Sequence, residues 1–216
     1  ICVNNGGRGT QVYKSADVDI VNNTFYQNMR TPDVAGIGSE VMAYDSERVR
    51  FANNLIISRA GVLPLTAGET DPVTFANNLT VGTIAPQKHP SDSHLSFGTQ
   101  VLTSPSIDGG AFTEAGFTPV AGSAAIDHGT SGYTGALAVD FAGNTRVGGS
   151  APDAGALERG ASAASTWPYA GSLEGPGGEA PVAPTEPTPE PEAPAAPSPG
   201  RQDAVGRLYS AAFLRA

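Results

Sequence analysis

Short runs of alternating apolar and polar residues recur in the N-terminal part of the chain, and each run leads into a pair of asparagines. The copies span residues 18–25, 49–56 and 73–80, and a less regular copy opens the chain at residues 1–5. Alternation with a period of two predicts β-strands. Asparagine tolerates left-handed backbone angles, so each pair predicts a sharp bend between two strands.

Alignment of these copies reveals a third strand upstream of each one. Successive residues of a strand face opposite sides, so the aligned columns separate inward from outward positions. The inward column holds Val12, Ala43 and Ala67, whereas Gln11, Met42 and Thr66, and likewise Tyr13 and Tyr44, share outward columns. A repeat of roughly 20–30 residues made only of strands can bury its apolar face only against its neighbours. We therefore predict an all-β fold, a parallel β-helix (a solenoid) in which stacked asparagines form a ladder.

The pattern divides the chain into four segments. The strand signal weakens but continues to about residue 118, so residues 1–118 are predicted to form solenoid rungs. Residues 119–160 predict an irregular closing module over the last rung, since an open strand edge invites aggregation. Residues 161–200 are rich in Pro, Gly and Glu and predict a disordered linker. Residues 201–216 have apolar residues at helical spacing and predict the first helix of a further domain.

The closing segment contains five charged residues with two interpretations. Asp127, Asp140, Arg146, Asp153 and Glu158 have the chemistry of an acid, a base and a guanidinium clamp. Aspartate beside glycine also closes turns, and an arginine among carboxylates holds such turns together by forked hydrogen bonds. The second, structural interpretation is favoured.

The composition excludes some classes of partner but does not identify the function. The 216 residues carry a formal net charge of −9, which disfavours nucleic acid and anionic membranes as partners but leaves room for an anionic polysaccharide at a local cationic site. The single cysteine excludes an internal disulfide framework, and no run is apolar enough to span a bilayer. We expect a monomer, and a fragment of a longer protein because the chain begins within a repeat.

Two groups of residues are candidate ligand contacts. Tyr13 and Tyr44 are predicted to stack outward on adjacent rungs, either as a surface for sugar rings or merely on each other. Arg30 and Asp33 lie in an insertion, residues 27–38, and insertions in solenoids often gather on the binding face. The alternative is that both are solvated loop charges. We predict no metal ligand within the chain.

Three stretches resemble known families. Residues 3–28 look like the right-handed parallel β-helix proteins of the pectate-lyase-like superfamily, in particular secreted bacterial ones akin to family nine polysaccharide lyases. Residues 122–158 resemble the choice-of-anchor Q closing module. Residues 205–216 are similar to the start of a helical domain of unknown function in secreted bacterial proteins.

The lyase resemblance implies cleavage of acidic polysaccharides by β-elimination, with calcium held by clustered aspartates and a lysine as the base. The family pattern places Gln11 where that lysine should be, and glutamine is no general base. Lys14 is a displaced candidate for the catalytic base, although Asp45 and Glu69 share its column and favour an ion pair. The resemblance places the calcium ligands upstream of this chain.

Together these observations predict an extracellular or cell-surface bacterial protein that binds or cleaves an acidic polysaccharide, as a lyase or uronan epimerase if it is an enzyme. Gln11, Tyr13, Lys14, Arg30, Asp33 and Tyr44 are expected around the groove. The alternative is a non-catalytic surface or matrix protein in which the strands form a rigid spacer.

Overall fold

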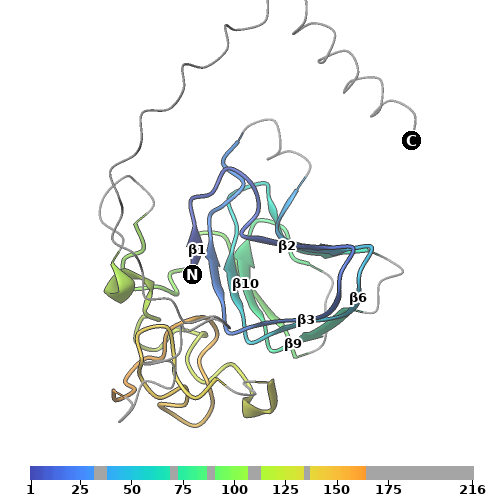
Figure 1. The fold of residues 1–216 in the computed structure, drawn as a ribbon. Coiled ribbons are helices and arrows are strands. Elements are labelled where there is room, and N and C mark those ends of the chain that lie inside the picture. Colours follow the sequence, from blue (N-terminus) through green and yellow to red (C-terminus); the bar gives the residue numbers. More distant parts are fainter. Residues whose placement is uncertain (32–37, 69–72, 87–90, 107–112, 134–136, 164–216) are drawn as a thin grey trace, which may run out of the picture. The chain divides into compact units, whose positions relative to one another are not determined.

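The strands of the protein form three parallel sheets, here called A, B and C (Figure 1). The computed structural model describes residues 1–31, 38–68, 73–86, 91–106, 113–133 and 137–163. Sheet A has the order β1 (Cys2–Val3), β4 (Thr24–Tyr26), β7 (Leu55–Ile57), β10 (Leu79–Gly82) and β11 (Ser93–Ser96). Sheet B is β2 (Thr10–Tyr13), β5 (Ser39–Tyr44) and β8 (Leu63–Ala67); sheet C is β3 (Ala16–Val21), β6 (Glu47–Ala52) and β9 (Val73–Ala76). Two short 3₁₀ helices, η1 (Glu114–Phe117) and η2 (Ser131–Tyr133), follow.

From β2 to β10 the chain visits sheets B, C and A in rotation, and it does so three times. Each strand pairs in parallel with its counterpart in a neighbouring turn. The register aligns Ile20 with Phe51 and Phe75, and Tyr13 with Tyr44, as the sequence columns predict. The predicted all-β class and repeat alignment are therefore confirmed.

The space between the three sheets is filled by inward side chains. Phe51 is fully buried, and its ring stacks on that of Phe75 with centroids 5.6 Å apart. This inner core takes side chains from every sheet, namely Val12, Ile20, Phe25, Val41, Ala43, Val49, Phe51, Ile56 and Leu65. Free Cys2 lies at its edge, half-buried.

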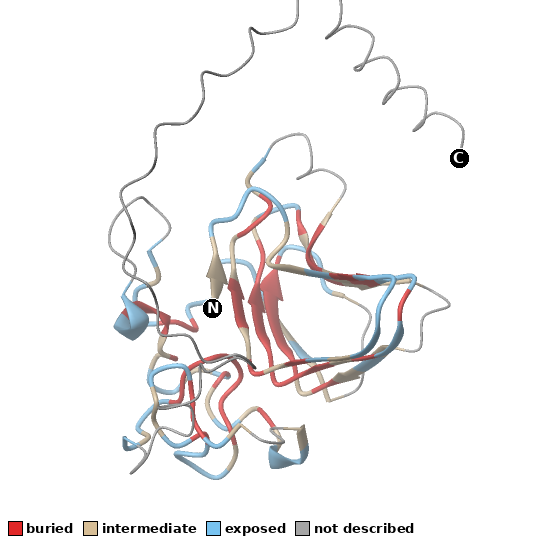
Figure 2. Ribbon diagram, viewed as in Figure 1, coloured by how far each residue is buried: buried red, intermediate tan, exposed pale blue. Residues whose placement is uncertain are grey.

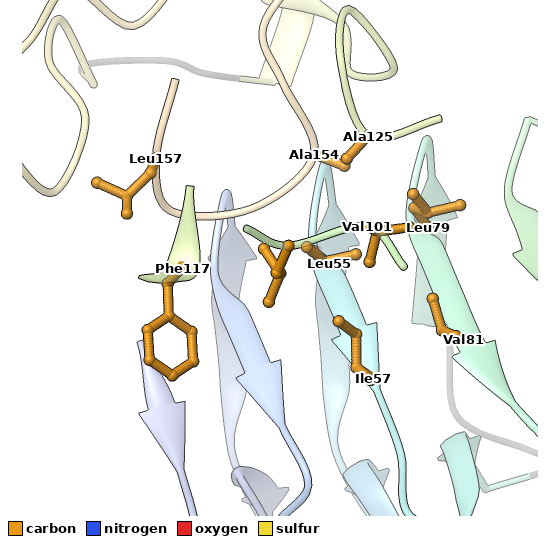
Figure 3. Close-up of a cluster of buried hydrophobic side chains, with 10 residues drawn as sticks. Leu55, Ile57, Leu79, Val81, Val101, Phe117, Ala125, Ala154 and Leu157 are labelled. Carbon is orange, nitrogen blue, oxygen red and sulfur yellow. The ribbon is translucent and has the colours of Figure 1, made fainter. Parts of the chain in front are cut away.

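A second core covers the opposite face of sheet A. Strands β7 and β10 are buried along their whole length (Figure 2). Figure 3 shows Leu55 and Leu79 facing Val101, Ala125 and Ala154 from the C-terminal segment. A strand that is apolar on both faces must be covered on both, which is the physical reason for this packing. The C-terminal segment thus packs along sheet A.

The two asparagines of each pair have separate tasks. The second ones form the predicted ladder: Asn54 Nδ2 donates to Asn78 Oδ1 (2.9 Å), and Asn54 Oδ1 accepts from the backbone N–H of Asn23 (2.9 Å). Asp92 continues the ladder in place of an asparagine, because the backbone N–H of Asn78 donates to Asp92 Oδ1 (2.7 Å). Because Asn54 and Asn78 are fully buried, these bonds satisfy polar groups that water cannot reach.

The first asparagines adopt left-handed angles and hold the C-terminal segment. Asn53 has φ 56°, and its side chain both donates to the carbonyl of Thr130 (2.9 Å) and accepts from its N–H (2.9 Å). Asn22 donates to the carbonyl of Asp153 (3.2 Å), and Asn77 to that of His128 (3.1 Å). One column of side chains thus fixes the C-terminal segment across three successive turns of chain.

Ordered contacts of the C-terminal segment reach slightly beyond residue 160. Ala163 forms a bridge with Asn144, and the N–H of Thr145 donates to the carbonyl of Ser162 (2.9 Å). The predicted linker beyond residue 163 and the predicted helix 201–216 lie outside the described residues. Within the described part of the chain, no helix is both long and apolar enough to cross a membrane.

Candidate functional site

The outer face of sheet B carries a pair of uncovered tyrosines. Tyr13 and Tyr44 occupy paired positions on β2 and β5, and their rings stack with centroids 6.1 Å apart and an interplanar angle of 16°. They are 49% and 55% exposed, whereas Val12 between Gln11 and Tyr13 is buried. Gln11 is exposed in the same strand. Strand alternation therefore brings both aromatic rings and an amide to one surface.

Lys14 adds a cation to this surface. It follows β2 with φ 48°, and its Nζ lies 5.3 Å from the centroid of the Tyr13 ring and 4.0 Å from Asp45 Oδ2. These are the contacts of a positively charged ammonium group, and they suit attraction of a ligand carboxylate better than proton abstraction. We call Gln11, Tyr13, Lys14 and Tyr44 the sheet B surface.

Arg30 belongs to a different corner of the protein. It lies in the connection from sheet A to sheet B, where its Nε donates to the carbonyl of Gln27 (3.1 Å). Arg59 donates to the carbonyl of Met29 (2.5 Å), and Arg8 donates to that of Ser39 (2.9 Å). These arginines brace the backbone of the connection, and the structure does not bring Arg30 to the tyrosine pair. Asp33 and Glu69 lie outside the described residues.

Glu40 is a buried carboxylate that the sequence pattern did not single out. It is fully buried at the start of β5 and accepts the backbone N–H of Asn28 (3.0 Å) and a close bond from the Asn28 side chain. Burial raises its pKa to about 7, against the opposing effects of the Asn28 hydrogen bonds and of Arg30 and Arg59. The only sequence signal was an acidic residue inside a predicted strand.

Replacing Glu40 by glutamine should remove a pH dependence of folding. Since the pKa is about 7 in the folded protein against an ordinary 4.5, the stability that this group contributes is fully present below the ordinary value and is lost as pH rises through 7. The difference corresponds to about 3 kcal/mol. Urea titrations at about pH 4 and about pH 8 measure it: wild type should lose more stability than Glu40→Gln.

Glu158 and His128 also have shifted pKa values, but both residues are present in the wild type and in the Glu40→Gln variant. Burial also raises the pKa of Glu158, to about 7, and lowers that of His128, whose protonation at low pH then opposes folding. Their effects cancel in the difference between wild type and variant. Parallel pH profiles for the two proteins would show that Glu40 is not the titrating group.

The charged residues of the closing segment are structural. Arg146 donates to Glu158 Oε1 (3.1 Å) and to the carbonyls of Gly155 and Ala156 (both 3.2 Å). Asp140 accepts backbone N–H groups of Asn144 (2.7 Å) and Glu158 (2.9 Å). These side chains are almost fully buried and bind backbone groups of turns, which supports the structural interpretation over a catalytic one.

The resembled lyases hold calcium with clustered aspartates, and the described residues contain no such cluster. Among the described residues, no group of three or more His, Cys, Asp or Glu side chains is placed to hold a metal ion. His94 instead shares a hydrogen bond with Thr80 (2.8 Å). The described residues therefore do not fit a calcium centre.

No protein-family model, no curated protein and no solved structure matched this chain. Kinship with any family thus rests on the motif resemblances of the sequence. Function rests on the geometry of the described residues, in which the sheet B surface combines exposed aromatic rings with a cation.

Proposed function

We propose that the protein binds an acidic polysaccharide on the sheet B surface, as a monomer. The observation that carries this proposal is the half-exposed Tyr13–Tyr44 stack with Lys14 beside it. Aromatic faces suit the C–H faces of sugar rings, and Lys14 offers a positive charge to a uronate carboxylate. Although the chain is acidic overall, the ligand would meet this local cation.

The proposed architecture is a right-handed parallel β-helix of the pectate-lyase-like superfamily, with residues 119–160 as a choice-of-anchor Q type module. The rotation through sheets B, C and A supports it, because parallel strands joined by a crossover within one sheet are almost always connected with a right-handed turn. Proteins of this kind act outside bacterial cells, so the proposed location is extracellular or at the cell surface.

Binding is favoured over cleavage at this surface. Gln11 occupies the position where the resembled lyases carry their base, and Lys14 is engaged with Tyr13 and Asp45. A lyase or epimerase reaction would need both an accessible base and charge neutralisation of the uronate. Calcium, if the protein uses it, would be held by residues outside those described.

Tyr13→Ala should weaken binding of polygalacturonate or alginate about tenfold, because it removes one of the two rings that a sugar can cover. Isothermal titration calorimetry measures this change.

Lys14→Gln should mainly reduce the salt dependence of binding, since it removes a screened charge. Phe141→Ala is the matched control, because Phe141 is similarly exposed (47%) but lies in the closing segment.

Three outcomes would redirect this proposal. Absence of binding to either polymer would favour the rigid-spacer function. Equal weakening by Tyr13→Ala and Phe141→Ala would remove the sheet B surface as the site. Ultraviolet absorbance from unsaturated uronates, formed during incubation with calcium, would establish a lyase, and Lys14→Ala would then show whether Lys14 takes part.

A further inference from the structure

A second surface cleft lies at the far end of sheet A. It has a volume of about 390 Å³, at the lower end of the size range of small-molecule sites. Its walls are the ends of β4, β7 and β10 and the segment 97–105 that follows β11. This cleft is separate from the sheet B surface, and neither the sequence motifs nor the proposed function assigns it a role.

The lining of the cleft has the two properties of a site for an uncharged, hydroxyl-rich ligand. Its base is apolar and buried: Ile57, Val81 and Val101 are 7%, 1% and 2% exposed. Its rim presents the aromatic rings of Tyr26 and Phe97, and all described residues that line it are uncharged. Arg30 binds the carbonyl of Gln27 but does not line the cleft, so a charged ligand would lose hydration with no charged group in the cleft wall to compensate.

The rim also offers polar groups that the fold leaves available. In the part of the chain that the structure describes, the side-chain amide of Gln27 and the hydroxyl of Thr99 make no hydrogen bond. The amide group of Gln100 donates only at 3.4 Å to the carbonyls of Leu102 and Thr103, and its oxygen is left as an acceptor. Amides and hydroxyls beside an aromatic ring match the hydroxyls and C–H face of a sugar.

The walls of the cleft are fixed before any ligand arrives. Leu102 pairs with Pro119, the N–H of Val120 donates to the carbonyl of Val101 (2.9 Å), and the N–H of Thr103 donates to that of Thr118 (3.0 Å). The ring of Tyr26 packs edge-on against Phe117, with centroids 5.7 Å apart. Such preorganisation lowers the entropy cost of binding.

Phe97 supplies the least explained feature of this region. Its ring is 45% exposed at the rim of the cleft, although a phenylalanine normally gains from burial. A sugar ring stacked on it would cover this apolar surface. We propose that the cleft binds a neutral glycosyl residue, independently of the acidic polymer on the sheet B surface.

Saturation-transfer NMR with cellobiose, maltose and β-1,4-galactobiose tests this proposal, with digalacturonate as the charged comparison. At least one neutral disaccharide should bind with a Kd on the order of 1 mM or tighter. Phe97→Ala and Thr99→Val should each weaken binding roughly five- to tenfold. Gln27→Asn, which keeps a residue tolerant of the left-handed φ of 48° while withdrawing the amide, should do the same.

The controls distinguish this site from the sheet B surface. Tyr13→Ala and Phe141→Ala should leave disaccharide binding unchanged, and Phe97→Ala should leave polygalacturonate binding unchanged. The proposal is overturned if none of the neutral disaccharides binds, if digalacturonate binds equally well, or if binding survives all three cleft substitutions.

Discussion

Asn54→Ala is expected to lower the free energy of unfolding by about 3–5 kcal/mol. The Asn54 side chain is fully buried, donates to the carbonyl of Ile20 (2.8 Å) and accepts the N–H of Asn23 (2.9 Å). Alanine would remove the side-chain donor to the carbonyl of Ile20 and the side-chain acceptor of the Asn23 N–H, and it would also remove the bond to Asn78. Urea denaturation followed by far-ultraviolet circular dichroism measures the loss.

Asn23→Ala is the matched control in the same ladder. Asn23 is half-buried, and its side chain donates only to the nearby carbonyl of Val21 (3.1 Å). The same truncation there should cost at most about 1 kcal/mol. Similar losses for the two variants would mean that the ladder bonds carry little stability and that the stacked apolar side chains hold the turns together alone.

The register of the sheets could be predicted because it depends on the sequence pattern within each repeat. Each strand alternates inward and outward residues, and the asparagine bend fixes where the next strand begins. A slip of one residue would turn Ile20, Phe51 and Phe75 out of the core, so the pattern permits one alignment. The outward pairing of Tyr13 with Tyr44 follows from the same alignment.

The place of the C-terminal segment could not be predicted in this way. Its contact between Asn53 and Thr130 joins residues 77 positions apart, and no periodic signal relates them. One signal was present in β7, whose consecutive apolar residues Leu55–Ile57 indicate a strand covered on both faces. Nor could the contacts of Arg30 be predicted, because the carbonyl of Gln27 that it binds carries no signal in the sequence pattern.

The cleft beside Phe97 likewise could not be predicted from the sequence. Its walls come from strand ends and from a segment that crosses them, so its lining is scattered along the sequence. Neither Gln27 nor Thr99 belongs to a motif. A site of this kind becomes visible only when the packing of the segment against sheet A is known.

Arg146→Met is expected to destabilise the closing segment by about 3–5 kcal/mol, because it leaves the buried carboxylate of Glu158 without its cation. Arg146 and Glu158 are each 5% exposed, and the guanidinium also binds the carbonyls of Gly155 and Ala156. Since Glu158 can be protonated at low pH, the loss should be larger at about pH 8 than at about pH 5. Urea denaturation at both pH values measures it.

Two companion variants decide the cause of this loss. Arg159→Met makes the same chemical change at an exposed arginine that donates to the carbonyl of Pro119 (2.8 Å), and it should cost at most about 1 kcal/mol. Adding Glu158→Gln to Arg146→Met should restore part of the stability, because the orphaned charge is gone. A double variant no more stable than Arg146→Met would assign the loss to the carbonyls of Gly155 and Ala156, and the arginine would then act as a clamp on the backbone rather than as a counterion.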